Sequence, residues 1–234
     1  MFEYGIMIGD KHTKRDWDLI CTRVEIESPE QETQYIEVPG RDGYIDLSEV
    51  LTGEPHYRNR NLNISLIRRE PDFRRWHIRA SDILDYCHNV RRKIIFDSDP
   101  SYYYEGRLKA ESSKDFKGVD CFTISVNAQP YKYERVSSLE PWIWDIFCFE
   151  DGIIRNYKDL QVDGKLTLII PGRRMKAVPV FECSSKMKLT YGEVDYILPE
   201  GRSKILDLQL GEGEHYLVFT GSGIISVDYR GGRL

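Results

Sequence analysis

Acid–base or metal chemistry is suggested first by two carboxylates that stand close together before a proline. Asp97 and Asp99 flank Ser98 and are followed by Pro100. Two carboxylates at this spacing can hold Ca²⁺ or serve as an acid and a base. However, the other ligands of a calcium loop are missing nearby, and aspartate side chains commonly cap turns that contain proline. We therefore interpret the pair as turn caps.

Nucleophilic and metal-dependent chemistry lack a recognisable motif. The five histidines show neither the spacing of a metal-binding helix nor a cysteine at zinc-finger spacing. Five scattered cysteines without a Cys-x-x-Cys pair indicate reduced, mostly buried thiols in a protein made in a cytoplasm. Gly221-Ser222-Gly223 precedes strand-like residues, which favours a hairpin turn over a nucleophile elbow. We expect no enzyme activity, no catalytic residues, no metal and no cofactor.

A basic segment offers a binding surface. Between residues 58 and 79, seven arginines stand against Glu70 and Asp72. Such a segment can meet phosphates or the acidic surface of a neighbouring copy. Because the whole chain has a net charge of −5, we favour contact with a neighbouring copy over nucleic acid. The candidate interface residues are Arg58, Arg60, Arg68, Arg69, Arg74 and Arg75.

Two tryptophans offer a second kind of binding. Trp142 and Trp144 share one face of a strand expected over 142–149, and exposed aromatic rings on such strands can stack on sugars. Ile146 continues the tryptophan face, while phenylalanines line the other face. Apolar residues on both faces are typical of a buried strand. We therefore predict that the tryptophans pack in the core, with glycan stacking as the alternative.

Short strands must position these residues, because most of the chain alternates with a period of two. Residues 61–66 and 121–126 alternate apolar and polar side chains, and residues 35–47 form an expected hairpin around a glycine-containing turn. One segment has helical spacing instead, which predicts a helix over 81–92 with Ser81 as its N-cap.

The second half alternates short expected strands with turn signals and shows no helical segment. Asp163-Gly164 predicts a two-residue hairpin turn, and separate strands are expected at Ile205–Leu210, Tyr216–Phe219 and Ile224–Tyr229. About nine strands at this spacing suggest a sandwich or a jelly roll. A short polar linker, 134–140, divides the 234 residues into domains of 1–135 and 136–234. No apolar run of about 18 residues and no secretory signal occur, so no membrane partner is expected.

The order of features in the first half resembles the distal tail proteins (Dit) of long-tailed, non-contractile bacteriophages and prophages. The matching features, in chain order, are the Pro39–Gly43 turn with Tyr44, Asp46 and Ser48; Tyr57 and Asn59-Arg60; Trp76 before the helix; Ile94–Pro100 running into Tyr102–Arg107; and Ala128–Tyr131. The likeness covers residues 1–133. The second half is similar mainly in pattern, ending in Phe219-x-Gly221-x-Gly223-x-x-Ser226-Val227-x-Tyr229.

The resemblance implies a mainly β protein with one helix. A tail-tube-like β-sandwich or barrel, the belt domain 1–135, would form a hexameric ring, and a galectin-like or jelly-roll β-sandwich, 136–234, would project outward. The protein would be made in the bacterial host cytoplasm and reside at the virion tail tip. Its partners would be its own copies, the tail tube protein, the tail-tip or tail-associated protein, and receptor-binding or baseplate proteins. DNA would pass through the channel without specific binding.

The resemblance thus implies a structural hub that joins the tail tube to the tip or baseplate and anchors receptor-binding proteins. In such a ring the arginine segment and the acidic first forty residues are expected to meet between copies. The alternative is a carbohydrate-binding module or adhesin for host cell-wall glycans. A hydrolase needs two carboxylates that face one cleft, and the sequence does not locate them.

Overall fold

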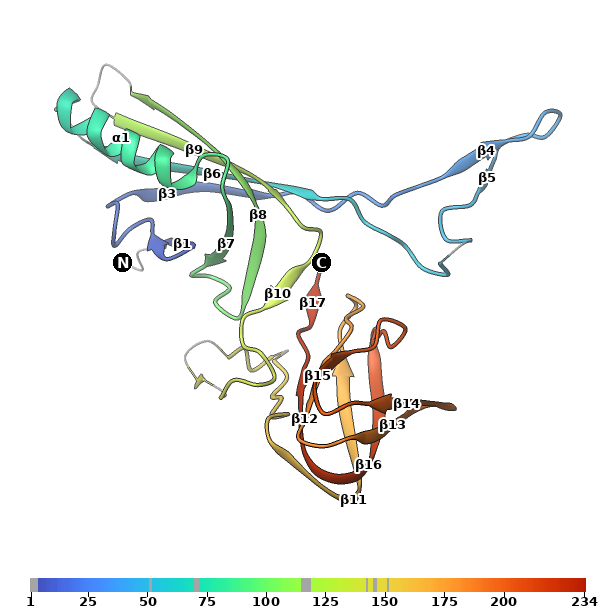
Figure 1. Ribbon diagram of the computed structural model, residues 1–234. Coiled ribbons are helices and arrows are strands. Elements are labelled where there is room, and N and C mark those ends of the chain that lie inside the picture. Colours follow the sequence, from blue (N-terminus) through green and yellow to red (C-terminus); the bar gives the residue numbers. More distant parts are fainter. Residues whose placement is uncertain are drawn as a thin grey trace. The chain divides into compact units, whose positions relative to one another are not determined.

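Strands make up most of the chain, so the predicted mainly β fold with one helix is confirmed. The computed structural model describes residues 4–50, 52–69, 72–114, 119–141, 143–144, 147–150 and 152–234 (Figure 1). The chain forms two compact units, Met1–Ser98 with Tyr104–Pro130, and Asp99–Tyr103 with Tyr131–Leu234. The domain boundary expected between residues 135 and 136 stays a prediction.

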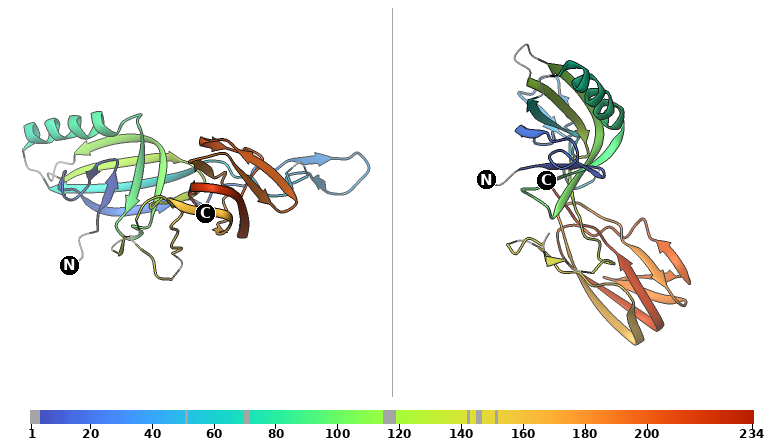
Figure 2. Two further views of the ribbon diagram at one scale, coloured as in Figure 1. Left: turned by 60° about the horizontal axis from the view of Figure 1, so that its bottom comes forward. Right: turned by 90° about the vertical axis from the view of Figure 1, so that its left-hand side faces the viewer.

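An antiparallel sheet with the strand order β2-β1-β7-β8-β9-β6-β3 forms the first unit, together with one helix and a separate two-stranded hairpin. Its elements are β1 (Ile6–Ile8), β2 (Lys11–His12), β3 (Ile20–Ile26), β4 (Tyr35–Glu37), β5 (Tyr44–Asp46), β6 (Arg60–Arg69), α1 (Phe73–Cys87), β7 (Arg91–Phe96), β8 (Tyr102–Lys114) and β9 (Val119–Ala128). Both views in Figure 2 show α1 lying along one side of this sheet.

The helix predicted over 81–92 is wrong at both ends. Asp72 is the N-cap of α1, because its side chain accepts a hydrogen bond from the Arg74 backbone N–H at 2.9 Å. The helix ends at Cys87 because Asn89 adopts a left-handed conformation, with a φ of 59°. The arginines after residue 90 therefore begin β7 and are not the last turn of the helix.

The core of the first unit lies between α1 and one face of the sheet. Leu62, Ile64 and Leu66 of β6 are fully buried together with Ile83 of α1, and the intervening β6 residues point to the opposite face. Burial also raises the pKa of the Cys87 thiol to about 12, so this thiol stays protonated at neutral pH. The alternation that predicted these strands therefore gives the sheet one apolar face and one polar face.

The second unit is built around a six-stranded antiparallel sheet with the order β14-β13-β16-β12-β15, to which β11 adds by pairing with β16. Its elements are β10 (Lys132–Glu134), β11 (Leu160–Gly172), β12 (Val180–Cys183), β13 (Met187–Tyr191), β14 (Val194–Leu198), β15 (Gly201–Lys204), β16 (Gly213–Asp228) and β17 (Gly232–Arg233). Its core contains Phe181 and Phe219, whose ring centroids lie 6.0 Å apart.

Two turns predicted in the second half are wrong, because both lie inside long strands. Asp163-Gly164 is within β11 and Gly221–Gly223 is within β16, and the ladder places Gly164 directly opposite Gly221. Both glycines have a positive φ, 76° and 149°. Residues without a Cβ can adopt these conformations, so the strand pair deforms locally without being interrupted.

The strand predicted at Ile205–Leu210 is also wrong. The paired strand lies just before this segment: β15 (Gly201–Lys204) pairs with β12. Leu208 and Leu210 are buried, and Leu210 forms only an isolated bridge with Ala177. These leucines thus fill the core from a loop. In the sequence, the pattern of this loop resembles that of a buried strand.

Candidate assembly surfaces

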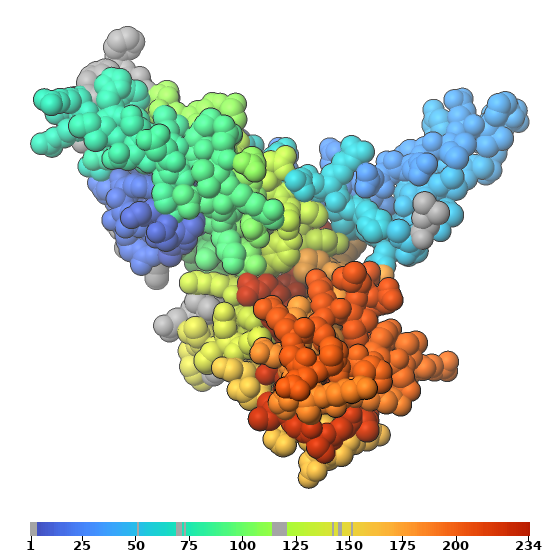
Figure 3. Space-filling view, in the orientation of Figure 1, coloured from blue at the N-terminus to red at the C-terminus, as the bar shows by residue number. Residues whose placement is uncertain are grey.

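The residues between β3 and β6 form an arm, defined here as residues 28–57, of which the structure describes all but residue 51. Its base continues the β3–β6 ladder in the same register, since the Arg58 N–H donates to the Glu30 carbonyl and the Glu32 N–H donates to the His56 carbonyl, both at 2.8 Å. Beyond this base, β4 and β5 pair with each other alone. The predicted hairpin over 35–47 is confirmed, and Figures 1 and 3 show it in blue beyond the end of β3.

One face of the arm combines aromatic and acidic side chains. The register pairs Tyr35 with Asp46 and Glu37 with Tyr44, so these four side chains lie on the same face. Tyr35 is 57% exposed and Tyr44 is 67% exposed, with ring centroids 6.3 Å apart. The whole arm carries seven carboxylates and one arginine, Arg41. It is therefore a strongly acidic hairpin with exposed rings.

The predicted interface arginines lie at opposite ends of β6. Arg58 and Arg60 stand where the arm joins this strand, whereas Arg68 and Arg69 stand at its other end, nine residues or about 30 Å away at ~3.3 Å per residue. The sequence groups them because they are near one another along the chain, but an extended strand separates them. They cannot form one continuous basic patch on a single copy.

The surroundings of these arginines differ. Arg60 is only 5% exposed, lies 5.8 Å from the centroid of the Tyr104 ring, and has its pKa lowered by burial. Arg68 forms an ion pair with Asp18 at 3.4 Å. Arg58, Arg74 and Arg75 are exposed, while the side chain of Arg69 lies outside the described part of the chain. Exposed candidates therefore include the two arginines in the first turn of α1.

A groove runs beside α1 at the end of the first unit opposite the arm. We call it the helix groove; its lining residues are Asp16, Trp17, Arg75, Ile78, Arg79 and Asp82. Arg75, Ile78 and Arg79 recur at the spacing i, i+3 and i+4, which places their side chains on one stripe of α1. Ile78 is 58% exposed although it is apolar. The groove thus has an apolar centre and a charged rim.

The side of the sheet that faces away from α1 is polar, and we call it the polar face. Two rows of side chains cross it from β3 through β6 and β9 to β8: Arg23, Ser65, Thr123, Glu111; and Glu25, Asn63, Ser125, Lys109. A third row continues with Asn61, Asn127, Arg107 and Arg91. The third row and the second row, apart from Glu25, line a wide groove.

Ion pairs neutralise most charges on the polar face. Lys109 binds Glu111 at 2.8 Å, Arg91 binds Glu105 at 3.1 Å, and Arg23 binds Glu25. The hydrogen bond with Lys109 lowers the pKa of the Glu111 carboxyl, which keeps this carboxylate charged. A polyanion near this surface would therefore meet little uncompensated positive charge.

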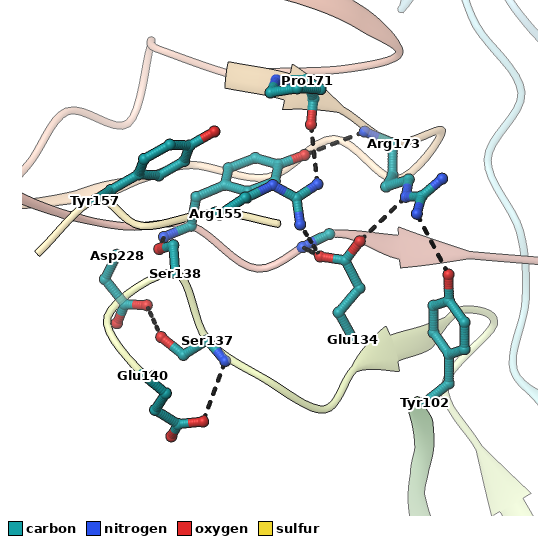
Figure 4. A network of polar contacts seen from close by, with 12 residues as sticks. Tyr102, Glu134, Ser137, Ser138, Glu140, Arg155, Tyr157, Pro171, Arg173 and Asp228 are labelled. Atoms are coloured by element: carbon teal, nitrogen blue, oxygen red, sulfur yellow. Dashed lines mark hydrogen bonds and ion pairs between the residues drawn. The ribbon is translucent and has the colours of Figure 1, made fainter. Parts of the chain in front are cut away.

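In the second unit, a buried carboxylate holds several segments together (Figure 4). Glu134 of β10 binds the guanidinium groups of Arg155 and Arg173, the latter at 3.1 Å, and accepts a hydrogen bond from the Gly231 N–H at 3.0 Å. Arg155 also donates to the Pro171 carbonyl at 2.9 Å. We call Glu134, Arg155 and Arg173 the carboxylate hub. It joins β10, the segment before β11, the end of β11 and the residues before β17.

The prediction that residues 142–149 form a buried strand is wrong for the described residues. Trp144 is 65% exposed and Phe149 is 69% exposed, with ring centroids 5.6 Å apart. Trp142 lies outside the described residues. Two described apolar residues of this segment, Trp144 and Phe149, therefore form an exposed aromatic pair. Periodicity alone cannot distinguish such residues from those of a core strand.

The carboxylates considered for catalysis have separate structural partners. Asp97 accepts a hydrogen bond from the Gly5 N–H at 2.9 Å and contacts His12 Nε2 at 3.1 Å. Asp99 binds Lys132 at 2.6 Å. The described residues contain no cluster of three or more potential metal ligands. Within that same part of the chain, no helix is long and apolar enough to cross a membrane.

The fold of the chain is similar to that of a solved phage protein. The crystal structure of the Dit protein of phage SPP1, described as a paradigm of the hub adsorption apparatus in phages that infect Gram-positive bacteria, superimposes with a TM-score of 0.61. The match covers 99% of both chains at 14% sequence identity. The chain has a Dit-like fold. No protein-family model and no curated protein sequence matches it, so the likeness that the sequence suggested is confirmed at the level of the fold.

Proposed function

We propose that this protein is a structural hub of a phage tail tip, in which six copies form a closed ring. The observation that carries the proposal is the likeness to SPP1 Dit over 99% of both chains, because it includes both units in one chain order. The expected partners are the tail tube protein on one side and tail-tip, baseplate or receptor-binding proteins on the other. The role is architectural and needs no catalytic group.

The strand edges of the first unit support a ring. Among the described strands, β3 lies at one end of the sheet and pairs only with β6, and the other end is formed by β2, which has two residues. Exposed edges invite pairing with other chains, and a closed ring covers them. We infer that the polar face lines the channel of this ring, because its paired charges give it little attraction for passing DNA.

The absolute mass of the purified chain tests the proposal. We expect light scattering after size exclusion to show a species six times the chain mass of 27.4 kDa, or reversible assembly towards it as concentration rises. Added tail tube protein should favour the same species, because both would share one ring axis. A strict monomer at high concentration, with and without the tail tube protein, would contradict the ring.

Glycan binding is the second candidate function, and one observation favours it. Trp144 and Phe149 form an exposed aromatic pair of the kind that stacks on sugar rings. If the pair binds host cell-wall glycans, a glycan array should show signals for the full chain that disappear in Trp144→Ala. Tyr216→Ala, which removes another half-exposed ring of the second unit, is the control. Absence of any signal with the unaltered chain would leave the hub as a docking platform only.

A further inference from the structure

We propose that the arm of one copy docks in the helix groove of the next copy. This inference rests on the proposed ring and names the contact that closes it. The arm presents the face formed by Tyr35, Glu37, Tyr44 and Asp46, and the groove presents the stripe of α1 around Ile78. Its occupant is a second copy of this chain.

The arm requires a partner because it cannot bury its own apolar side chains. An isolated two-stranded hairpin is marginally stable in water, and β4 and β5 pair with no further strand in the described structure. Tyr35, Tyr44 and Val50 each remain more than half exposed. The ladder at the base of the arm nevertheless fixes its direction. A preformed arm of this kind loses little conformational entropy when it docks.

The groove has the layout of a protein-binding site. Ile78, which is 58% exposed, lines the groove together with Trp17. The other lining residues, Asp16, Arg75, Arg79 and Asp82, are charged. Interfaces combine such an apolar centre with a polar rim, and aromatic and arginine side chains supply most of their binding energy. The two tyrosines of the arm can cover Ile78 and Trp17, while an arginine can also stack on a tyrosine ring.

Charge favours the same pairing. The arm has a net charge of −6, larger in magnitude than the −5 of the entire chain, whereas residues 68–79 contain five arginines and two carboxylates. In the groove lining itself, Arg75 and Arg79 stand beside Asp16 and Asp82, so the attraction for the arm comes from the two arginines of the α1 stripe. Arg75 and Arg79 are one turn apart on α1, and Glu37 and Asp46 lie on the two paired strands of the arm. Oppositely charged surfaces accelerate association and fix its register. Asp16 and Asp82 on the groove rim can pair with Arg41 at the arm tip.

The position of the two surfaces requires a second copy. The arm joins β6 at its first residue, Arg60, and α1 follows the last residue of β6, Arg69. A strand of this length keeps the two surfaces about 30 Å apart, so an arm cannot reach the groove of its own chain. Contacts between two different surfaces are head-to-tail, and they generate a ring when the rotation closes.

A charge exchange across the contact tests the inference. Arg75→Glu and Glu37→Lys, each alone, should raise the concentration at half-assembly by about tenfold or more, because each places like charges opposite each other. The double variant, which restores opposite charges with exchanged positions, should assemble nearly as well as the unaltered chain. Arg74→Glu and Glu49→Lys are matched controls, because they make the same charge changes at exposed positions of α1 and the arm outside the two faces.

Light scattering on the full chain provides the readout, and circular dichroism confirms that each variant is folded. Weakened assembly in both single variants and recovery in the double variant support the contact. Unchanged assembly in the single variants overturns the docking proposal but leaves the ring intact. Loss of tail tube protein binding without loss of the ring would assign the arm a different partner and also overturn it. An unaltered chain that never assembles contradicts the ring as well.

Discussion

Replacement of Glu134 by glutamine should lower the free energy of unfolding of the second unit by about 3–5 kcal/mol. The Glu134 side chain is 11% exposed, and its partners Arg155 and Arg173 are 5% and 14% exposed. A neutral amide leaves two largely buried guanidinium groups without a counter-charge, and this loss costs far more than the loss of a surface ion pair. The effect is confined to the second unit because every member of the carboxylate hub belongs to it.

Calorimetry and amide hydrogen exchange together measure this effect. We expect the transition of the second unit to move to a lower temperature and the amides of β10 and β17 to exchange faster, since β10 pairs with β17 next to Glu134. Asp195→Asn is the matched control, because it neutralises the carboxylate of the Lys188–Asp195 ion pair, in which both side chains are about half exposed. A Glu134→Gln variant as stable as this control would show that the hub does not hold the unit together.

Conversion of three carboxylates of the polar face to lysine should create a surface that binds DNA. Glu25→Lys, Glu105→Lys and Glu111→Lys each replace the partner of an existing cation, Arg23, Arg91 or Lys109. The triple variant therefore gains three positive charges and loses three negative ones on one surface, a net change of +6 per chain. If the three introduced lysines neutralise three phosphates, the affinity of the triple variant for DNA should fall roughly 40-fold between about 50 and 200 mM salt.

Fluorescence anisotropy with a short DNA duplex measures this gain. The unaltered chain should show no binding at moderate salt, and the triple variant should bind with a steep salt dependence. Glu193→Lys, Glu200→Lys and Glu212→Lys form the control, because they add the same charge at exposed sites in the second unit. Tight binding by the unaltered chain would contradict the view that ion pairs keep the polar face neutral toward DNA.

The sequence alone determined the features that depend on local periodicity. Alternation over 61–66 and 121–126 predicted β6 and β9 and the side of each that is buried, because a strand places successive side chains on opposite faces. The glycine-containing turn predicted the arm hairpin for a similar reason, since turn chemistry depends on a few adjacent residues. Together these local signals were sufficient for the mainly β fold and for the likeness to Dit proteins.

Only the tertiary structure decided how distant segments combine. Gly164 and Gly221 belong to sequence patterns typical of turns, but both lie within long strands, whose ladder places them directly opposite each other. Trp144 follows the sequence pattern of a core residue, yet the described residues around it form no strand and its side chain is exposed. The arginines predicted as interface candidates form one group along the chain and two groups in space, because β6 is extended. The burial of a side chain, the register of a strand pair and the distance between two side chains depend on contacts between residues far apart in the chain. A local sequence pattern contains no information about those contacts.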